Sequence, residues 1–492
     1  MSGAGELISH GLLKLSGINP FSGKTTVQNG ILTFLNRNSL YNGDATQWTA
    51  DRITVTDKAT LALGIGNTPD KFSAIDAQTV SRIGSASGGF LGGSFIGLDT
   101  SAGQFTQDRA LTNPNGGANA LGLRVLGTNT LTLTAANTYS GATFVDEGTL
   151  RAGAVNTFSA NSAFEVDDPA TLDLGGFSNE IGSLGGSNQS AWEGVVTTSN
   201  GPATLTTGRL GTSTGFGGKL QDGGAGRELS VVKTGGGTWK LSGTNSYRGS
   251  TTVSGGTLEI GSASTLGNGH YAADLSIASG AALKFTSRTN QTLASSITGG
   301  GALILDSAWT NTDRRISSVL TLTGDNSAHT GKTTVTSGTL ALPKRGALYG
   351  GDTARWTSSH LSVGNFGTLA LGVGDAGAGQ FTPSDVNALV GVPVTSGIFL
   401  PGSAIGIYAA SNADIHVSSN PDAYDTNLIN INRTTLENLL GQTGVSLLTA
   451  PPDIAGGDGK IKILDNLAWG SNRLSLTAAG DIHIDAVMRP WG

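Results

Sequence analysis

The sequence contains no cysteine among its 492 residues, which excludes disulfide bonds and thiolate metal sites. Charged residues make up 13% of the chain, about half the share found in ordinary globular proteins. The formal net charge is −6, and Lys and Arg form no cluster that would attract nucleic acid or an anionic membrane surface. We therefore expect no nucleic-acid partner.

Long apolar runs are also missing. No stretch approaches the roughly 18 apolar residues that a membrane-spanning helix needs, so we expect no transmembrane segment in this chain. The first 20 residues lack the basic start and apolar core of a signal peptide. Histidines are few and dispersed, with no pair at metal-ligand spacing, so we expect solvated positions, no metal and no cofactor. They are His10, His270, His329, His360, His416 and His483.

Glycine is abundant instead, with 76 residues, roughly twice the usual share. Apolar and polar residues alternate in short runs, as in 131–134, 320–323 and 474–477, and such runs predict strands buried on one face. Helical patterns are nearly absent, and 434–440 is the clearest short candidate. The composition therefore predicts an all-β, turn-rich and repetitive fold.

Four segments, which begin near residues 11, 129, 237 and 320, share one plan. An alternating strand leads to a turn that contains Asn, then a glycine, a second short strand, a second glycine and a third strand. Glycine suits such corners because it adopts positive φ without a Cβ clash, and Asn tolerates the same region. The plan predicts coils that stack as a β-solenoid with inward Leu, Val and Ile. The paired glycines are Gly23/Gly30, Gly141/Gly148, Gly249/Gly256 and Gly331/Gly338.

A larger unit is also duplicated. Residues 23–66 align without gaps to 331–374, and about half of the aligned positions are identical. A solenoid tolerates such duplication because each coil contacts only its neighbours. We predict four blocks, the third of which resembles residues 11–110. The blocks are 1–126 with the first repeat, 127–317 with the second and third repeats, 318–425 as the duplicated block, and 426–492 as a distinct set of coils.

These segments resemble the passenger-associated transport repeat of autotransporters, also called the autotransporter-associated β-strand repeat. The third copy, 237–258, follows the pattern Gly-Thr-Leu-x-Leu-x-Gly-x-Asn-x-Tyr-x-Gly-x-Thr-x-Val-x-x-Gly-Thr-Leu nearly throughout. Two copies depart from the pattern. Phe21 stands at the tyrosine position of the first copy. In the fourth copy we assign Ala328 to that position, with one extra residue before Gly331.

Residues 427–486 are similar to coils of the filamentous haemagglutinin type. Both resemblances imply a right-handed parallel β-helix with loop excursions. They also imply an extracellular or cell-surface protein that serves in adhesion, aggregation, biofilm or filament assembly. The C-terminal translocation barrel of a complete autotransporter is not expected within this chain, because the series of about 10-residue alternating strands that would build it is missing.

Several short motifs have structural explanations. The strings Gly23-Lys24-Thr25 and 331–333 lack the spacing of a phosphate loop, and 211–215 matches a nucleophile-elbow string without its strand-to-helix context. Residues 456–459 match only part of a calcium-binding nonapeptide, without repetition. The adjacent carboxylates Asp167 and Asp168 would point to opposite faces of a strand, so they predict a solvated turn rather than a catalytic pair.

Four aromatic residues occupy equivalent places in the duplicated block, namely Tyr41 and Trp48 in the first copy and Tyr349 and Trp356 in the second. Their first interpretation is apolar packing beneath a loop that leaves the coil. Their second is contact with a glycan or a protein partner.

We predict a non-enzymatic structural or adhesive surface protein, with self-association end to end or side by side and with host or matrix glycans or proteins as partners. The alternative is a polysaccharide-binding or polysaccharide-degrading enzyme, since parallel β-helices also host such activities. An enzyme would need acids and bases on successive coils along one groove, which the low charge density disfavours.

Overall fold

The computed structural model divides the chain into two compact units, Met1–Ser250 and Thr251–Gly492, and each is described by itself. The described residues are 3–186, 194–307, 318–374, 377, 379–390, 397–409, 414–417, 428–431, 433–441, 443–449, 460–464, 466–470, 472–478, 480–484 and 488–490.

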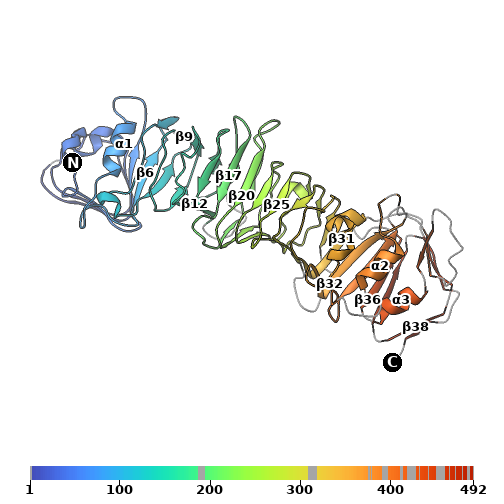
Figure 1. The fold of residues 1–492 in the computed structure, drawn as a ribbon. Helices are drawn as coiled ribbons and strands as arrows, with labels where there is room; N and C mark the ends of the chain where they lie inside the picture. Colours follow the sequence, from blue (N-terminus) through green and yellow to red (C-terminus); the bar gives the residue numbers. More distant parts are fainter. Residues whose placement is uncertain are drawn as a thin grey trace. The chain divides into compact units, whose positions relative to one another are not determined.

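Unit 1 consists mainly of short strands (Figure 1). Their bounds are β1 (Leu7–Leu15), β2 (Thr25–Phe34), β3 (Ile53–Val55), β4 (Thr60–Gly64), β5 (Gly89–Phe90), β6 (Phe95–Asp99), β7 (Phe105–Gln107), β8 (Gly122–Leu126), β9 (Thr130–Leu133), β10 (Thr143–Val145), β11 (Thr149–Ala152), β12 (Ala163–Val166), β13 (Thr171–Asp173), β14 (Asn179–Ile181), β15 (Ser183–Gly185), β16 (Val195–Thr197), β17 (Ala203–Thr207), β18 (Thr214–Phe216), β19 (Lys219–Leu220), β20 (Leu229–Lys233) and β21 (Thr238–Leu241). The helical elements are η1 (Arg37–Ser39), η2 (Tyr41–Gly43), η3 (Ala45–Gln47), α1 (Ala74–Ser81) and η4 (Asn115–Gly117).

Unit 2 has the same character. Its strands are β22 (Thr251–Val253), β23 (Thr257–Ile260), β24 (His270–Tyr271), β25 (Leu275–Ile277), β26 (Ala282–Phe285), β27 (Gln291–Leu293), β28 (Ile297–Thr298), β29 (Ala302–Asp306), β30 (Val319–Leu322), β31 (Thr333–Leu342), β32 (Leu361–Val373), β33 (Ala404–Ala409), β34 (Asp414–Val417), β35 (Leu428–Ile431), β36 (Gly444–Leu448), β37 (Ile461–Ile463), β38 (Leu467–Trp469), β39 (Leu474–Thr477), β40 (Ile482–Ile484) and β41 (Met488–Pro490). The helical elements are η5 (Gly267–Gly269), η6 (Arg345–Ala347), η7 (Tyr349–Gly351), η8 (Thr353–Arg355), α2 (Pro383–Val390) and α3 (Arg433–Leu440).

The described strands pair in parallel. Some pair with the next strand of the chain, as β31 does with β32, and others pair across one or more intervening strands, as β9 does with β11. In unit 1 the longest sheet runs β15-β12-β10-β8-β6-β4-β2-β3-β5, with β1 beside β2, and a second runs β19-β16-β13-β11-β9-β7. In unit 2 the main sheet contains the path β23-β26-β29-β31-β32-β33-β36-β39. Such pairing is the pattern of a parallel β-solenoid, and it confirms the predicted fold class.

Apolar side chains of successive coils form ladders inside each unit. In unit 1, Leu131 of β9 aligns with Leu150 of β11, which aligns with Leu172 of β13. In unit 2, Leu340 of β31 aligns with Leu369 of β32. All five side chains are buried, and burying one such side chain contributes about 1.5–3 kcal/mol to folding. The run 131–134 therefore buries its leucines on one face, as predicted. The other two runs differ, because Thr321 of 320–323 is buried as well and both leucines of 474–477 are only partly buried.

Buried asparagines link the corners of neighbouring coils. The Asn137 side chain is 5% exposed; its Oδ1 accepts from the Leu111 N–H at 2.8 Å, and its Nδ2 donates to the Thr157 carbonyl at 2.6 Å. Leu111 lies one coil before Asn137, and Thr157 lies one coil after it. A corner leaves backbone groups without a strand partner, and a buried unpaired group is costly. The Asn137 amide thus gives a hydrogen-bond partner to one backbone group of the preceding coil and to one of the following coil.

Asn326 repeats this arrangement in unit 2. Its Oδ1 accepts from the Ile297 N–H at 2.7 Å, and its Nδ2 donates to the Ala347 carbonyl at 2.8 Å. In the first repeat, Asn19 Nδ2 donates to the Ser39 carbonyl at 3.0 Å. In these three repeats the asparagine is therefore an interior link between coils, in addition to being a turn former.

The helices differ in part from expectation. The candidate at 434–440 is confirmed as α3, which contacts β36 and β38 (Figure 1). The near absence of helical patterns elsewhere was misleading, because α1 and α2 are both present. Each lies on a loop excursion, where eight residues are too few for a clear apolar period. Among the residues that the structure covers, no helix is long and apolar enough to cross a membrane.

We expect Asn137→Ala to destabilise unit 1 by about 1–3 kcal/mol, because the Leu111 N–H and the Thr157 carbonyl would remain buried without this partner. Denaturant unfolding followed by tryptophan fluorescence measures the effect. Asn161→Ala, at an exposed position of the following coil, is the matched control and should change stability little. Equal stability of the two variants would contradict the role assigned to Asn137.

Candidate functional site

The four aromatic residues picked out in the duplicated block lie on 3₁₀ turns that leave the coil. Tyr41 belongs to η2 and Trp48 follows η3, while Tyr349 belongs to η7 and Trp356 follows η8. All four side chains are 2–4% exposed. The structure therefore places them in packing beneath the loop. Their contact with a glycan or protein stays a prediction, and direct contact would require the loop above them to open.

The Tyr41 hydroxyl fastens the turn to the solenoid. It lies 3.1 Å from the Gly23 carbonyl, 3.0 Å from Thr25 Oγ1 and 3.0 Å from the Arg52 carbonyl. The Tyr41 backbone has φ of 49°, in the left-handed region that non-glycine residues seldom adopt. Burial raises the pKa of the Tyr41 hydroxyl, while its hydrogen bond to Thr25 and the Arg52 charge lower this pKa by smaller amounts. The hydroxyl is therefore a neutral hydrogen-bonding group that holds two coils and a loop together.

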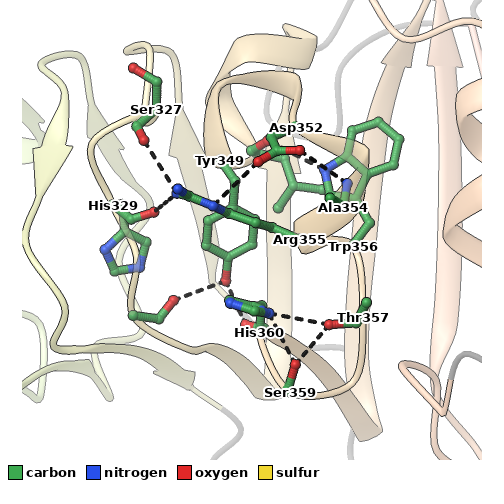
Figure 2. Close-up of polar contacts among 12 residues, drawn as sticks. Ser327, His329, Tyr349, Asp352, Ala354, Arg355, Trp356, Thr357, Ser359 and His360 are labelled. Carbon is green, nitrogen blue, oxygen red and sulfur yellow. Dashed lines mark hydrogen bonds and ion pairs between the residues drawn. The ribbon is translucent and has the colours of Figure 1, made fainter.

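Tyr349 makes the same contacts in unit 2. Its hydroxyl lies 3.2 Å from the Gly331 carbonyl and 3.0 Å from Thr333 Oγ1, and it donates to the His360 carbonyl. Its φ is 52°. Burial raises the pKa of this hydroxyl as well. Figure 2 shows the Tyr349 ring between the His329 and His360 segments. Both copies thus place one strained tyrosine at the same junction.

A second layer in unit 1 stacks Arg37 on Trp48. The guanidinium carbon lies 5.1 Å from the Trp48 ring centre, and Arg37 Nε is 3.2 Å from the Asp76 carboxylate. Trp48 also packs on Phe72 at 5.9 Å and donates from Nε1 to the Leu40 carbonyl at 3.4 Å. The indole therefore supports the arginine from behind, through a cation–π contact.

Unit 2 repeats this layer with equivalent residues. The Arg345 guanidinium carbon lies 5.3 Å from the Trp356 ring centre, and Arg345 Nε lies 3.0 Å from Asp385 Oδ1. The ring centres of Trp356 and Phe381 are 5.9 Å apart. The acidic residue also caps a helix in each copy. Asp76 accepts from the Ser73 backbone at 3.0 Å, and Asp385 accepts from Thr382 at 2.9 Å. We call this set, in either copy, the Arg–Trp–Asp layer.

A groove of about 590 Å³ opens beside the Arg–Trp–Asp layer of unit 1. Two cations and two carboxylates line it, so the formal charges cancel. The Lys71 ammonium is already engaged by the Leu35 carbonyl at 3.0 Å and by Asn36 Oδ1 at 2.6 Å. The lining residues are Arg37, Gly66, Asn67, Thr68, Pro69, Lys71, Ser73, Ala74, Asp76, Phe105, Thr106 and Asp108. Asn67, Thr68, Thr106 and Asp108 offer exposed polar groups.

The groove was not predicted from the sequence. Its residues come from the η1 turn, from the excursion that carries α1, and from β7 and the residues beside it, which are well separated in the chain. One signal was available, because Ser73 followed three residues later by Asp76 is a helix-capping pattern. No motif, however, connects the excursion with β7.

The tyrosine position of the repeat, two residues before the corner glycine, faces inward in all four copies. Phe21, Tyr139, Tyr247 and His329 hold this position, and all are buried. The assignment of Ala328 to it was wrong, because the extra residue of the fourth copy precedes His329. The expectation that all histidines are solvated was also wrong at His329, whose side chain is 2% exposed.

The remaining motifs lie at structural positions. Thr25 is buried at the start of β2, where it bonds Tyr41, and Thr333 does the same in β31 with Tyr349. Residues 211–215 lead into β18, and Asp167 and Asp168 lie in the turn between β12 and β13. The glycine-rich stretch 456–459 lies outside the described residues. Within the described ranges, no group of three His, Asp or Glu side chains could hold a metal ion.

Comparison with known proteins gives two matches. The model of the passenger-associated transport repeat family matches residues 11–34, 123–152, 231–260 and 317–342, which are the four predicted repeats. Over 184 residues the chain is 35% identical to a protein described as adhesin BmaC autotransporter of Brucella suis biovar 1 (strain 1330). The match covers 35% of this chain and 5% of that protein. No solved structure matches the chain. The predicted resemblance to autotransporter passengers and their repeats is confirmed.

We expect Tyr41→Phe to destabilise unit 1 by about 1–2 kcal/mol, because the substitution removes the one hydroxyl that the Thr25 side chain and the Gly23 and Arg52 carbonyls share. Hydrogen exchange of peptides that contain Thr25 and Arg52, together with the denaturant midpoint, reports the change. Thr49→Ala, at an exposed position of the same loop, is the control. If both variants behave alike, the hydroxyl does not fasten the loop.

Proposed function

We propose that this chain, a parallel β-solenoid with the passenger-associated transport repeats of autotransporters, is part of a bacterial protein that acts by adhesive contact outside the cell or at its surface. The four repeats, together with the similarity to an autotransporter adhesin, carry the proposal. Because the matched region spans 5% of that adhesin, only the general class is transferred. Biofilm or filament assembly is one form that such contact would take.

We further propose that the chain is not an enzyme. Several of its charged residues form pairs across neighbouring coils, as Arg124 does with Asp146 at 2.7 Å and Arg151 with Asp173 at 2.7 Å. Each of these carboxylates pairs with an arginine of a neighbouring coil, so its role is to fix the register between coils. A polysaccharide-cleaving site would instead need carboxylates that converge, unpaired, on one glycosidic bond.

The groove beside Arg37 is the contact site that we propose for a glycan. Sugars present hydroxyl groups and apolar ring faces, and neutral sugars carry no charge. The groove offers exposed amide, hydroxyl and carboxylate groups, the exposed ring of Pro69 and no net formal charge. In this proposal Trp48 acts indirectly, because it supports Arg37 at the groove wall.

Self-association is a second mode that a specific observation favours. Leu12 is 84% exposed on β1, and Ile8 of the same strand is also exposed. On β40, Ile482 and Ile484 are exposed, although they align with the buried Ile461 and Ile463 of β37. Exposed apolar groups on strands at the edge of a sheet favour pairing with a further strand, and in this proposal a second copy of the chain provides it.

The glycan proposal predicts that the purified chain binds a subset of neutral glycans on an array. Asn67→Ala and Asp108→Ala should each weaken that binding about five- to tenfold, which corresponds to the loss of one hydrogen bond or slightly more. Glu147→Ala, an exposed carboxylate of unit 1 that does not line the groove, should leave binding unchanged.

Three results would count against the proposal. Binding that is insensitive to both groove variants would remove the groove as the contact site. A chain that binds no glycan, surface or second copy would contradict the adhesive function. Release of new reducing ends from a polysaccharide would show an enzyme instead.

A further inference from the structure

His329 occupies an aromatic position of the repeat that is elsewhere filled by a tyrosine or phenylalanine. Its ring stacks on the Tyr349 ring with centres 5.7 Å apart and planes within 6°, as Phe21 packs on Tyr41 in unit 1 at 4.7 Å. The side chain is 2% exposed, and neither ring nitrogen makes a hydrogen bond of ordinary geometry. The imidazole therefore serves as an apolar ring, which is possible only while it is neutral.

The charged side chains around His329 offer no free carboxylate that would stabilise a positive charge (Figure 2). From the η8 turn, Arg355 Nη1 donates to the His329 carbonyl at 3.1 Å and to the Ser327 carbonyl at 3.3 Å. The acid on this side, Asp352, is already paired with Arg355 at 3.4 Å. On the far side of Tyr349, His360 lies 5.9 Å from the tyrosine ring centre. A protonated His329 would thus be repelled by the Arg355 charge, and the nearby Asp352 is already paired with that arginine.

Two further elements pack here without adding charge. His329 forms an isolated bridge with Gly299 of the preceding coil, which offers only its backbone. On its own segment, Asp325 accepts from the Ser327 N–H at 3.0 Å. Burial lowers the pKa of His329 to about 4 from its ordinary 6.5; the Gly299 backbone opposes this shift, and the Arg355 charge adds to it.

The direction of the pH effect follows from that shift. The open or unfolded segment binds a proton near pH 6.5, whereas the closed segment binds one only near pH 4. The stabilisation of the closed form is complete above about pH 6.5 and is lost as the pH falls toward 4. Mild acid therefore favours opening.

We propose that His329 is an acid-sensitive latch: when it takes up a proton, the loop 345–360 lifts from the solenoid and exposes the aromatic rings of Tyr349 and Trp356. The loop is the segment that moves because the Tyr349 ring, against which His329 stacks, belongs to it and is one of its two attachments to the solenoid. Its hydroxyl bonds to Gly331, Thr333 and His360 hold the turn only while the ring stays in place.

Unit 1 provides an internal comparison. The same loop architecture there rests on Phe21, which cannot take up a proton, so the loop 37–52 should remain closed in mild acid. At neutral pH both copies of the duplicated block would keep their aromatic rings buried. In mild acid only the second copy would expose them. The latch is independent of whether the groove binds a glycan.

Hydrogen exchange of the full chain between pH 7.5 and 4.5, corrected for the intrinsic pH dependence of exchange, tests the proposal. Peptides within 345–360 should lose protection by about 10- to 100-fold more than peptides within 37–52. His329→Phe should abolish the difference. Phe21→His should transfer the acid sensitivity to 37–52. His360→Asn, which removes the neighbouring imidazole, should retain the wild-type response.

The proposal is overturned if 345–360 opens equally in wild type and His329→Phe, because carboxylates would then be responsible. It is also overturned if neither loop responds to pH in the wild-type chain. Should His329→Phe fail to fold, His329→Tyr is the second variant, since tyrosine fills this position at Tyr139 and Tyr247. It should remove the acid response in the same way.

Discussion

The need to satisfy the corners of every coil is the constraint on which the structure depends. Strand backbones pair with the coils before and after them, but the corners between strands have no such ladder. Asn137 and Asn326 solve this problem with one amide each, bonded to a backbone N–H one coil earlier and to a carbonyl one coil later. Glycines make the corners sterically possible. Gly148 has a φ of 65°, and a Cβ atom at this position would lie only 2.5 Å from the Asn129 carbonyl oxygen.

Loop excursions can then be added without disturbing the coils. In the duplicated block the excursion is attached by one tyrosine hydroxyl and one Arg–Trp–Asp layer, and both copies keep these contacts. What differs between the copies is the ring beneath the tyrosine, which is Phe21 in one and His329 in the other. Two sites of the same construction can therefore differ in their response to pH through one residue.

The sequence was sufficient to predict the coils but not the excursions that leave them. Glycine spacing and alternating runs predict the parallel solenoid because coil contacts are local and repeat with the motif. The groove joins β7 to the α1 excursion, and nothing in a repeat pattern reports a contact between non-repeated segments. The burial of His329 was missed because the alignment put Ala328 in its place. Counting back from Gly331 instead of forward from Asn326 would have identified it.

In-register parallel stacking is the central claim, and it can be measured directly because the native chain has no cysteine. Thr204 of β17 and Ser230 of β20 are register partners with outward side chains. Parallel neighbours lie about 4.8 Å apart, within the range that a disulfide spans. The account predicts an intramolecular disulfide in Thr204→Cys/Ser230→Cys under mild oxidation, and none in Thr206→Cys/Ser230→Cys, as measured by mass spectrometry. The reverse result would contradict the stacking.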